Sequence, residues 1–123
     1  MTVFLVEDSP LLRERLSAML SGIPASVLVG YAETAKDAIE GIVEKKPDVV
    51  VLDLSLKDSN GFDVLRAIRT RAPSADAYVL TNHPIEGFRK VAERLGAKGF
   101  FDKSTEFDKL RELLKHRAAG AAA

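Results

Sequence analysis

The sequence predicts an α/β fold in which five parallel strands form one sheet that helices cover on both faces. Short apolar runs alternate five times with stretches of helical periodicity, which is the order expected of successive β–α units. The runs are continuous and mostly β-branched or aromatic, as in strands that are buried on both sides. With right-handed crossovers, such units give a (βα)₅ three-layer sandwich.

The individual elements follow from these periods. The expected strand segments are Val3–Val6, Val27–Val29, Val49–Leu52, Ala77–Leu80 and Phe100–Phe101. After each strand, apolar residues recur at helical spacing and mark one helix. Three of these helices are expected to begin at the hydroxyl residues Ser9, Thr34 and Thr105, which can accept a hydrogen bond from the first turn. Gly96 suits the end of the fourth helix.

Two strand orders are compatible with this alternation. The order 2-1-3-4-5, counted along the five expected strands, is favoured because it makes strands 1, 3, 4 and 5 neighbours. Polar residues follow each of those four strands, whereas none follows Val27–Val29, which becomes an edge. We assign residues 1–118 to one domain and expect the alanine-rich residues 119–123 to be disordered.

The composition is that of an ordinary globular protein, with 46% hydrophobic and 29% charged residues. Lys plus Arg and Asp plus Glu number 18 each, so the net charge gives no reason to expect nucleic-acid or membrane binding by this chain. No apolar run reaches the ~18 residues of a membrane span. The lack of cysteine excludes disulfides and thiol catalysis and fits a reducing cytosol, so a cytoplasmic location is expected.

Polar side chains follow four of the five strands. Glu7 and Asp8 follow the first strand, Asp53 the third, Thr81 the fourth and Lys103 the fifth. The carboxyl ends of parallel strands share one edge of the sheet, and ligands of open α/β sheets bind there. A charge on Asp53 against an apolar run is costly unless an ammonium or a metal compensates it. Crowded carboxylates favour a hard cation, Mg²⁺ or Mn²⁺.

These side chains suit phosphoryl chemistry. The Asp53 carboxylate can attack phosphorus to form an acyl phosphate. The Lys103 ammonium can neutralise charge on the phosphoryl oxygens, and the Thr81 hydroxyl can donate to one of them. Each residue also has an ordinary interpretation, since acids often lie in solvated loops, threonine caps turns and lysine is commonly exposed. Their joint placement at four strand ends favours a site.

The motifs at these positions match a known family. They are Val6-Glu7-Asp8-Ser9, Val51-Leu52-Asp53-Leu54, Gly61, Leu80-Thr81, and Lys103 after Gly99-Phe100-Phe101-Asp102. Over nearly its full length, the chain resembles the receiver domain of two-component response regulators. The resemblance implies a flavodoxin-like fold, whose strand order agrees with the one favoured above. It implies a signalling switch rather than an enzyme, one that catalyses only its own phosphorylation and dephosphorylation.

The resemblance implies a role for each acidic position. Asp53 corresponds to the phosphoacceptor and also to a metal ligand. Asp8 corresponds to the direct metal ligand, Glu7 to a ligand acting through water, and Ser55 to a ligand through its backbone carbonyl. Glu7 stands where aspartate is more usual, and Lys57 stands where many members have proline, which predicts a more mobile loop after Asp53.

The remaining matched positions concern the phosphoryl group and the switch. Lys103, Thr81 and the backbone of Asn82 would bind the phosphoryl group. Thr81 and the aromatic residue Phe100 would change position on phosphorylation. Ser55 and His83 are candidates for tuning the lifetime of the phosphorylated form. Two interpretations of His83 stay open, a residue that orients the hydrolytic water and an exposed loop residue, and the second is favoured.

The resemblance also implies the partners. The phosphoryl donor is a phosphohistidine on a histidine kinase or a phosphotransfer protein. The switch is read by a downstream protein or by an output domain of a longer regulator, and it allows a phosphorylation-dependent homodimer.

Other functions are compatible with the fold. The main alternative is a phosphorylation-independent interaction module. A haloacid-dehalogenase-type phosphatase would need a second aspartate where Ser55 stands. A flavin-binding role is weaker, because acids occupy the loop after the first strand.

Overall fold

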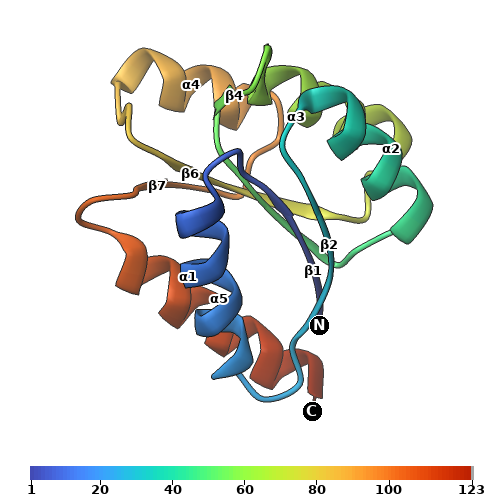
Figure 1. Ribbon diagram of the computed structural model, residues 1–123, viewed down its shortest axis with the longest axis vertical. Coiled ribbons are helices and arrows are strands. Elements are labelled where there is room, and N and C mark those ends of the chain that lie inside the picture. The colour runs from blue at the N-terminus through green and yellow to red at the C-terminus, as the bar shows by residue number, and fades with distance from the viewer. Residues whose placement is uncertain (123) are drawn as a thin grey trace.

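The computed structural model places one parallel sheet between two layers of helices (Figure 1) and describes residues 1–122, with side chains described for residues 1–120. The strands are β1 (Thr2–Val6), β2 (Val27–Ala32), β3 (Val49–Leu52), β6 (Asp76–Thr81) and β7 (Gly99–Asp102), in the order β2-β1-β3-β6-β7. All four pairings are parallel. The predicted order is confirmed, because β6 and β7 are the fourth and fifth strands of the sheet.

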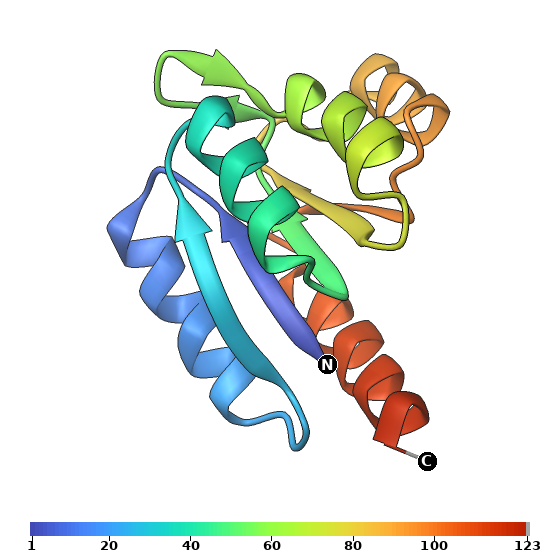
Figure 2. The same ribbon diagram turned by 90° about the vertical axis from the view of Figure 1, so that its right-hand side faces the viewer.

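The five helices divide between the two faces. They are α1 (Pro10–Ser21), α2 (Ala35–Lys45), α3 (Gly61–Arg71), α4 (Glu86–Arg94) and α5 (Phe107–Ala122). Helices α1 and α5 cover one face and α2, α3 and α4 cover the other (Figure 2). Alternate residues of β1 therefore enter different cores: Phe4 and Val6 pack with α2 and α3, whereas Val3 and Leu5 pack with α1 and α5.

The helix ends agree with the sequence at three of four positions. Ser9 Oγ accepts the Leu12 N–H at 3.3 Å, and Thr34 Oγ1 accepts the Asp37 N–H at 3.2 Å. Gly96 follows α4 with a φ of +97°, a conformation that glycine adopts readily.

The expected cap at Thr105 is wrong, because residues 103–105 form a turn and α5 begins only at Phe107. The preceding Glu106 carboxylate instead accepts the Asp102 N–H at 3.0 Å. Helix α5 continues through Ala122, and residue 123 lies outside the described residues. The disorder expected for residues 119–123 stays a prediction.

A small hairpin follows β3, and the sequence did not predict it. Its strands are β4 (Ser55–Leu56) and β5 (Ser59–Asn60), joined by a turn in which Asp58 has a φ of +56°. Strands of two residues are too short to show an alternating pattern. The loop after Asp53 is thus paired with itself, and its mobility stays a prediction.

Within residues 1–122, the helices are all too short or too polar to span a bilayer.

Phe4 occupies a slot between two glycines, which leads to a stability prediction. A Cβ at Gly41 of α2 would lie 2.6 Å from Phe4 Cζ, and one at Gly30 of β2 would lie 2.9 Å from Phe4 Cε2. Gly41→Ala should therefore destabilise the fold by about 1–3 kcal/mol in urea titration, although alanine favours helices. In a Phe4→Leu background the penalty should shrink. Equal stability of Gly41→Ala and wild type would contradict this packing.

Hydrogen bonds of Asp48 join the starts of β1 and β3, and the stability that they contribute should depend on pH. Its carboxylate accepts the Thr2 N–H at 2.8 Å and the Thr2 hydroxyl at 3.1 Å, and the Thr2 N–H bond above all lowers the pKa of Asp48. The stabilisation should be present above the unfolded pKa of about 3.9 and lost as the pH falls through the lower folded value. Asp48→Asn should lower the folding stability by less than about 1 kcal/mol at pH 7, because Asp48 is exposed. In strong acid it should leave the stability unchanged. Urea titrations across pH test this, and a pH-independent difference would contradict it.

Candidate functional site

Three carboxylates meet where β1 and β3 end. The strands are neighbours, with Val6 opposite Leu52, so the residues that follow them lie side by side. Glu7, Asp8 and Asp53 each offer a carboxylate oxygen, and these oxygens all lie within 4.8 Å of one another. Glu7 and Asp53 are buried, with 2% and 5% exposure. Such crowding of anionic groups requires a positive charge nearby.

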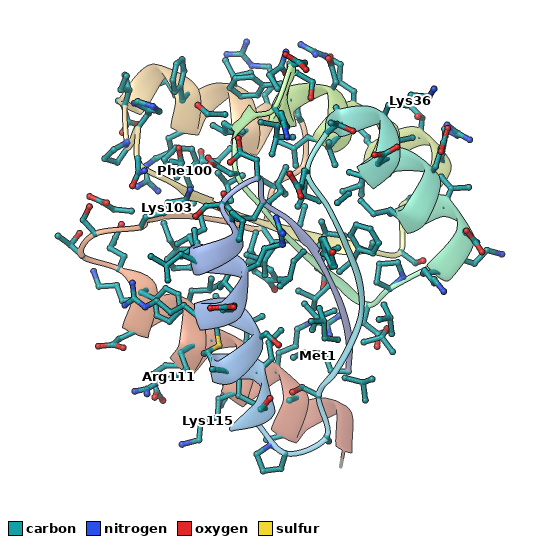
Figure 3. The ribbon with its side chains drawn as sticks, viewed as in Figure 1. Met1, Lys36, Phe100, Lys103, Arg111 and Lys115 are labelled. Atoms are coloured by element: carbon teal, nitrogen blue, oxygen red, sulfur yellow. The ribbon has the colours of Figure 1, made fainter. Side chains whose placement is uncertain are left out.

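Lys103 supplies one such charge from the end of β7. Its Nζ lies 2.7 Å from Asp53 Oδ2 and 2.8 Å from Glu7 Oε1. The Lys103 N–H donates to the Thr81 carbonyl at 2.9 Å, which joins the ends of β6 and β7. In Figure 3, Lys103 lies beside the N-terminal end of α1, close to where β1 ends. The structure thus brings together side chains that are distant in sequence.

The protonation of this cluster reflects its burial. Desolvation raises the pKa of Glu7, and the hydrogen bonds from Lys103 and from the Ser9 N–H oppose the increase without cancelling it. Burial also disfavours the Lys103 ammonium, but its hydrogen bonds to Asp53 and Glu7 outweigh burial and raise the pKa of Lys103. Lys103 therefore stays charged at neutral pH, and its single ammonium contacts two of the three carboxyl groups.

The donor set fits a hard divalent cation. Oxygen ligands are those that Mg²⁺ and Mn²⁺ prefer. Both Glu7 oxygens are engaged, Oε1 with Lys103 and Oε2 with the Ser9 N–H at 3.0 Å. Asp8 is partly exposed and, within residues 1–120, its carboxylate makes no hydrogen bond or ion pair. This difference suits Asp8 as a direct ligand and Glu7 as one acting through water.

Ser55 lies on the hairpin beside Asp53. Its N–H donates to Asp53 Oδ1 at 3.2 Å, and its side chain is exposed. The hairpin thereby places the Ser55 backbone next to the acidic cluster. The roles expected for Ser55, as a carbonyl ligand and in lifetime tuning, stay predictions.

The segment after β6 holds the other polar candidates. Thr81 is fully buried, and its Oγ1 accepts the His83 N–H at 3.1 Å. Asn82 and His83 are exposed. The backbone of this segment therefore contacts the Thr81 hydroxyl, whereas the His83 side chain faces solvent. The roles of Thr81, Asn82 and His83 stay predictions.

Phe100 is buried below α4. The residue is 4% exposed, and the Arg89 guanidinium carbon lies 4.8 Å from the centroid of its ring. Arg89 Nη1 also donates to the Phe100 carbonyl at 3.4 Å. Figure 3 shows Phe100, which lies in β7, close to Lys103, which follows the end of that strand. The aromatic ring is thus in an inward position that α4 covers, and Arg89, which sequence reasoning did not identify, joins the two elements.

A second residue that the sequence did not reveal is Arg13 of α1. Its Nη1 donates to the Glu7 carbonyl at 2.9 Å, and its Nη2 lies 3.5 Å from Glu33 Oε1. An arginine in the second turn of a helix is ordinarily solvated, so only its closeness to the acidic pair in sequence could have singled it out.

Comparisons with known proteins agree on the family. The model of the response regulator receiver domain family matches residues 3–115. The chain is 31% identical to the DNA-binding transcriptional activator DevR/DosR of Mycobacterium tuberculosis, across 96% of this chain and 54% of that protein. It is 30% identical to the nitrate/nitrite response regulator protein NarL of Escherichia coli, across 97% of this chain and 55% of that protein.

Solved structures agree as well. A two-component response regulator of the LuxR family from Aurantimonas sp. has a TM-score of 0.88 and 30% identity, over 97% of this chain and 85% of that one. The response regulator domain of Thermotoga maritima CheB has a TM-score of 0.84 and 27% identity, over 98% and 95%.

The chain belongs to the response regulator receiver domain family of two-component systems. It spans about half the length of DevR/DosR and NarL, at 54% and 55%, and 19% of the regulatory protein LuxO of Vibrio cholerae. The receiver is thus a signalling module that in these relatives forms part of a longer protein.

Proposed function

We propose that Asp53 accepts a phosphoryl group from a phosphohistidine donor and that the resulting charge switches the receiver between two conformations. The observation that carries this proposal is the contact of Lys103 Nζ with Asp53 Oδ2, at 2.7 Å, within the acidic cluster. An Asp53 oxygen forms a bond to phosphorus while the bond between phosphorus and the histidine nitrogen breaks. The imidazole leaves with the electron pair of that bond.

The residues around Asp53 have complementary tasks. Asp8, Asp53 and the Ser55 carbonyl would hold Mg²⁺ directly and Glu7 through water, and the bound ion would offset charge on the phosphoryl oxygens. Lys103 would exchange its carboxylate partner for a phosphoryl oxygen. The Thr81 hydroxyl would give up the His83 N–H and donate to another oxygen, so the segment after β6 would shift.

The shift would be transmitted through α4. Phe100 and α4 are linked by Arg89, so movement of the segment that precedes α4 changes the cover over the aromatic ring. Phosphorylation adds about −1.5 to −2 charge at Asp53, which gives the two states different contacts with Thr81 and Lys103. We infer that an output domain or a separate protein binds one state better, since DevR/DosR is by name a DNA-binding activator.

Intact-protein mass spectrometry tests the proposal. Acetyl phosphate or phosphoramidate with Mg²⁺ should add about 80 Da to wild type and nothing to Asp53→Asn. Asp108→Asn, an exposed position on α5, is the matched control and should gain the same mass as wild type. An unchanged mass of wild type would favour the phosphorylation-independent interaction module. An equal gain in Asp53→Asn would mean that another residue accepts the phosphoryl group, and it would contradict the proposal as well.

A further inference from the structure

Glu33, in the connection between β2 and α2, contacts Arg13 of α1, which binds the Glu7–Asp8 loop, and also contacts Lys57 in the hairpin that carries Ser55. Its Oε1 lies 3.5 Å from Arg13 Nη2, and its Oε2 lies 3.8 Å from Lys57 Nζ. Its backbone carbonyl also accepts the Lys57 N–H at 3.3 Å. Glu33 is outside the acidic cluster formed by the three carboxylates. It is therefore a point at which three separate connections of the chain are joined.

The first contact leads to the loop that holds Glu7 and Asp8. Arg13 donates to the Glu7 carbonyl at 2.9 Å, and the same guanidinium lies 4.4 Å from the centroid of the Tyr31 ring. The Arg13 side chain is only 15% exposed, so its attraction to Glu33 is less screened than that of a surface pair. Glu33 and the Tyr31 ring thus both contact the guanidinium that holds the backbone of the acidic pair.

The second contact leads to the hairpin that holds Ser55. A hairpin with strands of two residues has little stability of its own. Two hydrogen bonds attach it to the segment after β2. The Lys57 N–H donates to the Glu33 carbonyl, and the Ala35 N–H at the start of α2 donates to Ser59 Oγ at 2.8 Å. The Lys57 side chain is 66% exposed, so its ion pair with Glu33 adds little beyond the backbone bond.

We propose that Glu33 is a positioning residue for the metal site, which sets Mg²⁺ affinity by holding the Glu7–Asp8 loop and the Ser55 hairpin in place. The inference rests on the proposed function in one respect, that the acidic cluster binds Mg²⁺. Residues that orient metal ligands commonly change affinity tenfold or more when replaced. Because the Arg13 contact is the less exposed of the two side-chain pairs, it carries most of the effect.

Calorimetric titration of the unphosphorylated chain with MgCl₂ tests the proposal without any transfer reaction. Glu33→Gln should weaken Mg²⁺ binding roughly tenfold. Asp58→Asn is the matched control: it removes the same charge at the tip of the hairpin, and asparagine tolerates the φ of +56° there. Its effect should stay below about twofold and should vanish in about 0.5 M salt, whereas the Glu33→Gln loss should persist.

Arg13→Gln provides an independent test that leaves Glu33 and every expected ligand in place. It should weaken Mg²⁺ binding as Glu33→Gln does, and the double variant should lose little more than either single variant, because both act through one contact. If urea titration shows that Glu33→Gln does not fold, the Arg13→Gln titration alone tests whether this contact sets Mg²⁺ affinity.

Two results would overturn the inference alone. In the first, wild type binds Mg²⁺, and the Mg²⁺ affinity of Glu33→Gln lies within about twofold of the wild-type affinity. In the second, Glu33→Gln and Asp58→Asn lose equal affinity and both recover in salt, which would assign the effect to charge. Failure of wild type to bind Mg²⁺ through its carboxylates would overturn the proposed function and this inference together.

Discussion

Replacing Lys103 with methionine should cost the metal-free protein about 3–5 kcal/mol of folding stability at neutral pH, the range for removing one partner of a buried ion pair. Lys103 contacts both Asp53 and Glu7, and the three side chains are 11%, 6% and 3% exposed. Without the ammonium, two carboxylates face each other in a buried site. Methionine keeps most of the volume, so the loss reports charge rather than packing.

The pH dependence of the Lys103→Met variant gives a second expected result. Burial already raises the pKa of Glu7, and the loss of Lys103 removes a hydrogen bond that opposes the increase. A carboxyl with a raised folded pKa stabilises the fold below its unfolded pKa of about 4.3, and that stabilisation is lost as the pH rises through the folded value. The folding stability of the variant should therefore approach that of wild type in acid and fall below it as the pH rises towards neutrality.

Lys109→Met is the matched control for this experiment. Lys109 also forms an ion pair, at 3.2 Å from Glu106 Oε2, but its side chain is 70% exposed. The control should lose less than about 1 kcal/mol. Urea titrations of both variants, with and without Mg²⁺, measure the difference, and Mg²⁺ should restore more stability to Lys103→Met than to the control. Equal losses in the two variants would show that the Asp53 cluster does not need its ammonium.

The sheet could be predicted because each of its strands contains an apolar run, although the runs expected for β2 and β7 were shorter than the strands Val27–Ala32 and Gly99–Asp102. A run such as Val49–Leu52, apolar at every position, is hard to place anywhere but in a strand buried on both faces. Once the strand order is known, Asp53 and Lys103 must lie at the same edge. The meeting of residues separated by 50 positions therefore follows from topology rather than from any local signal.

The parts that the sequence did not predict are those that depend on loops. The hairpin that begins at Ser55 has strands of two residues, too short to leave a pattern in the sequence. It is attached through hydrogen bonds with Glu33 and Ala35, which are distant in sequence. Arg13 and Arg89 have no distinctive spacing, and arginine on a helix is usually solvated. Their contacts with backbone carbonyls of Glu7 and Phe100 arise from the packing of helices on the sheet.

Gly61 makes possible the close approach of α3 to the backbone of Asp53 and Leu54. It is the first residue of α3, and its N–H donates to the Leu54 carbonyl at 2.8 Å. A Cβ at this position would overlap the Asp53 carbonyl oxygen and would lie 2.9 Å from Leu54 Cα. The atoms that it meets are backbone atoms, so no side-chain rotation can relieve the contact.

Gly61→Ala should therefore destabilise the protein by about 3 kcal/mol or more, at the upper end of the penalties for overpacking. It should also slow the acetyl phosphate reaction by roughly a hundredfold, because Asp53 must shift with its backbone and displacements near 1 Å have effects of that size. Urea titration measures the first effect, and the rate of mass gain measured on the folded variant gives the second.

The same substitution at Gly87 is the matched control, with the opposite expected sign. Gly87 lies in α4, and a Cβ there would meet nothing within 4 Å. Gly87→Ala should stabilise the fold by at most about 0.5–1 kcal/mol, the gain when alanine replaces glycine in a helix interior, because Gly87 lies in the first turn of α4. It should leave the rate unchanged. If Gly61→Ala matched Gly87→Ala in both measurements, the α3 terminus could move away from Asp53 at little cost. The position of Asp53 would then depend on β3 and on its hydrogen bonds with Ser55 and Lys103.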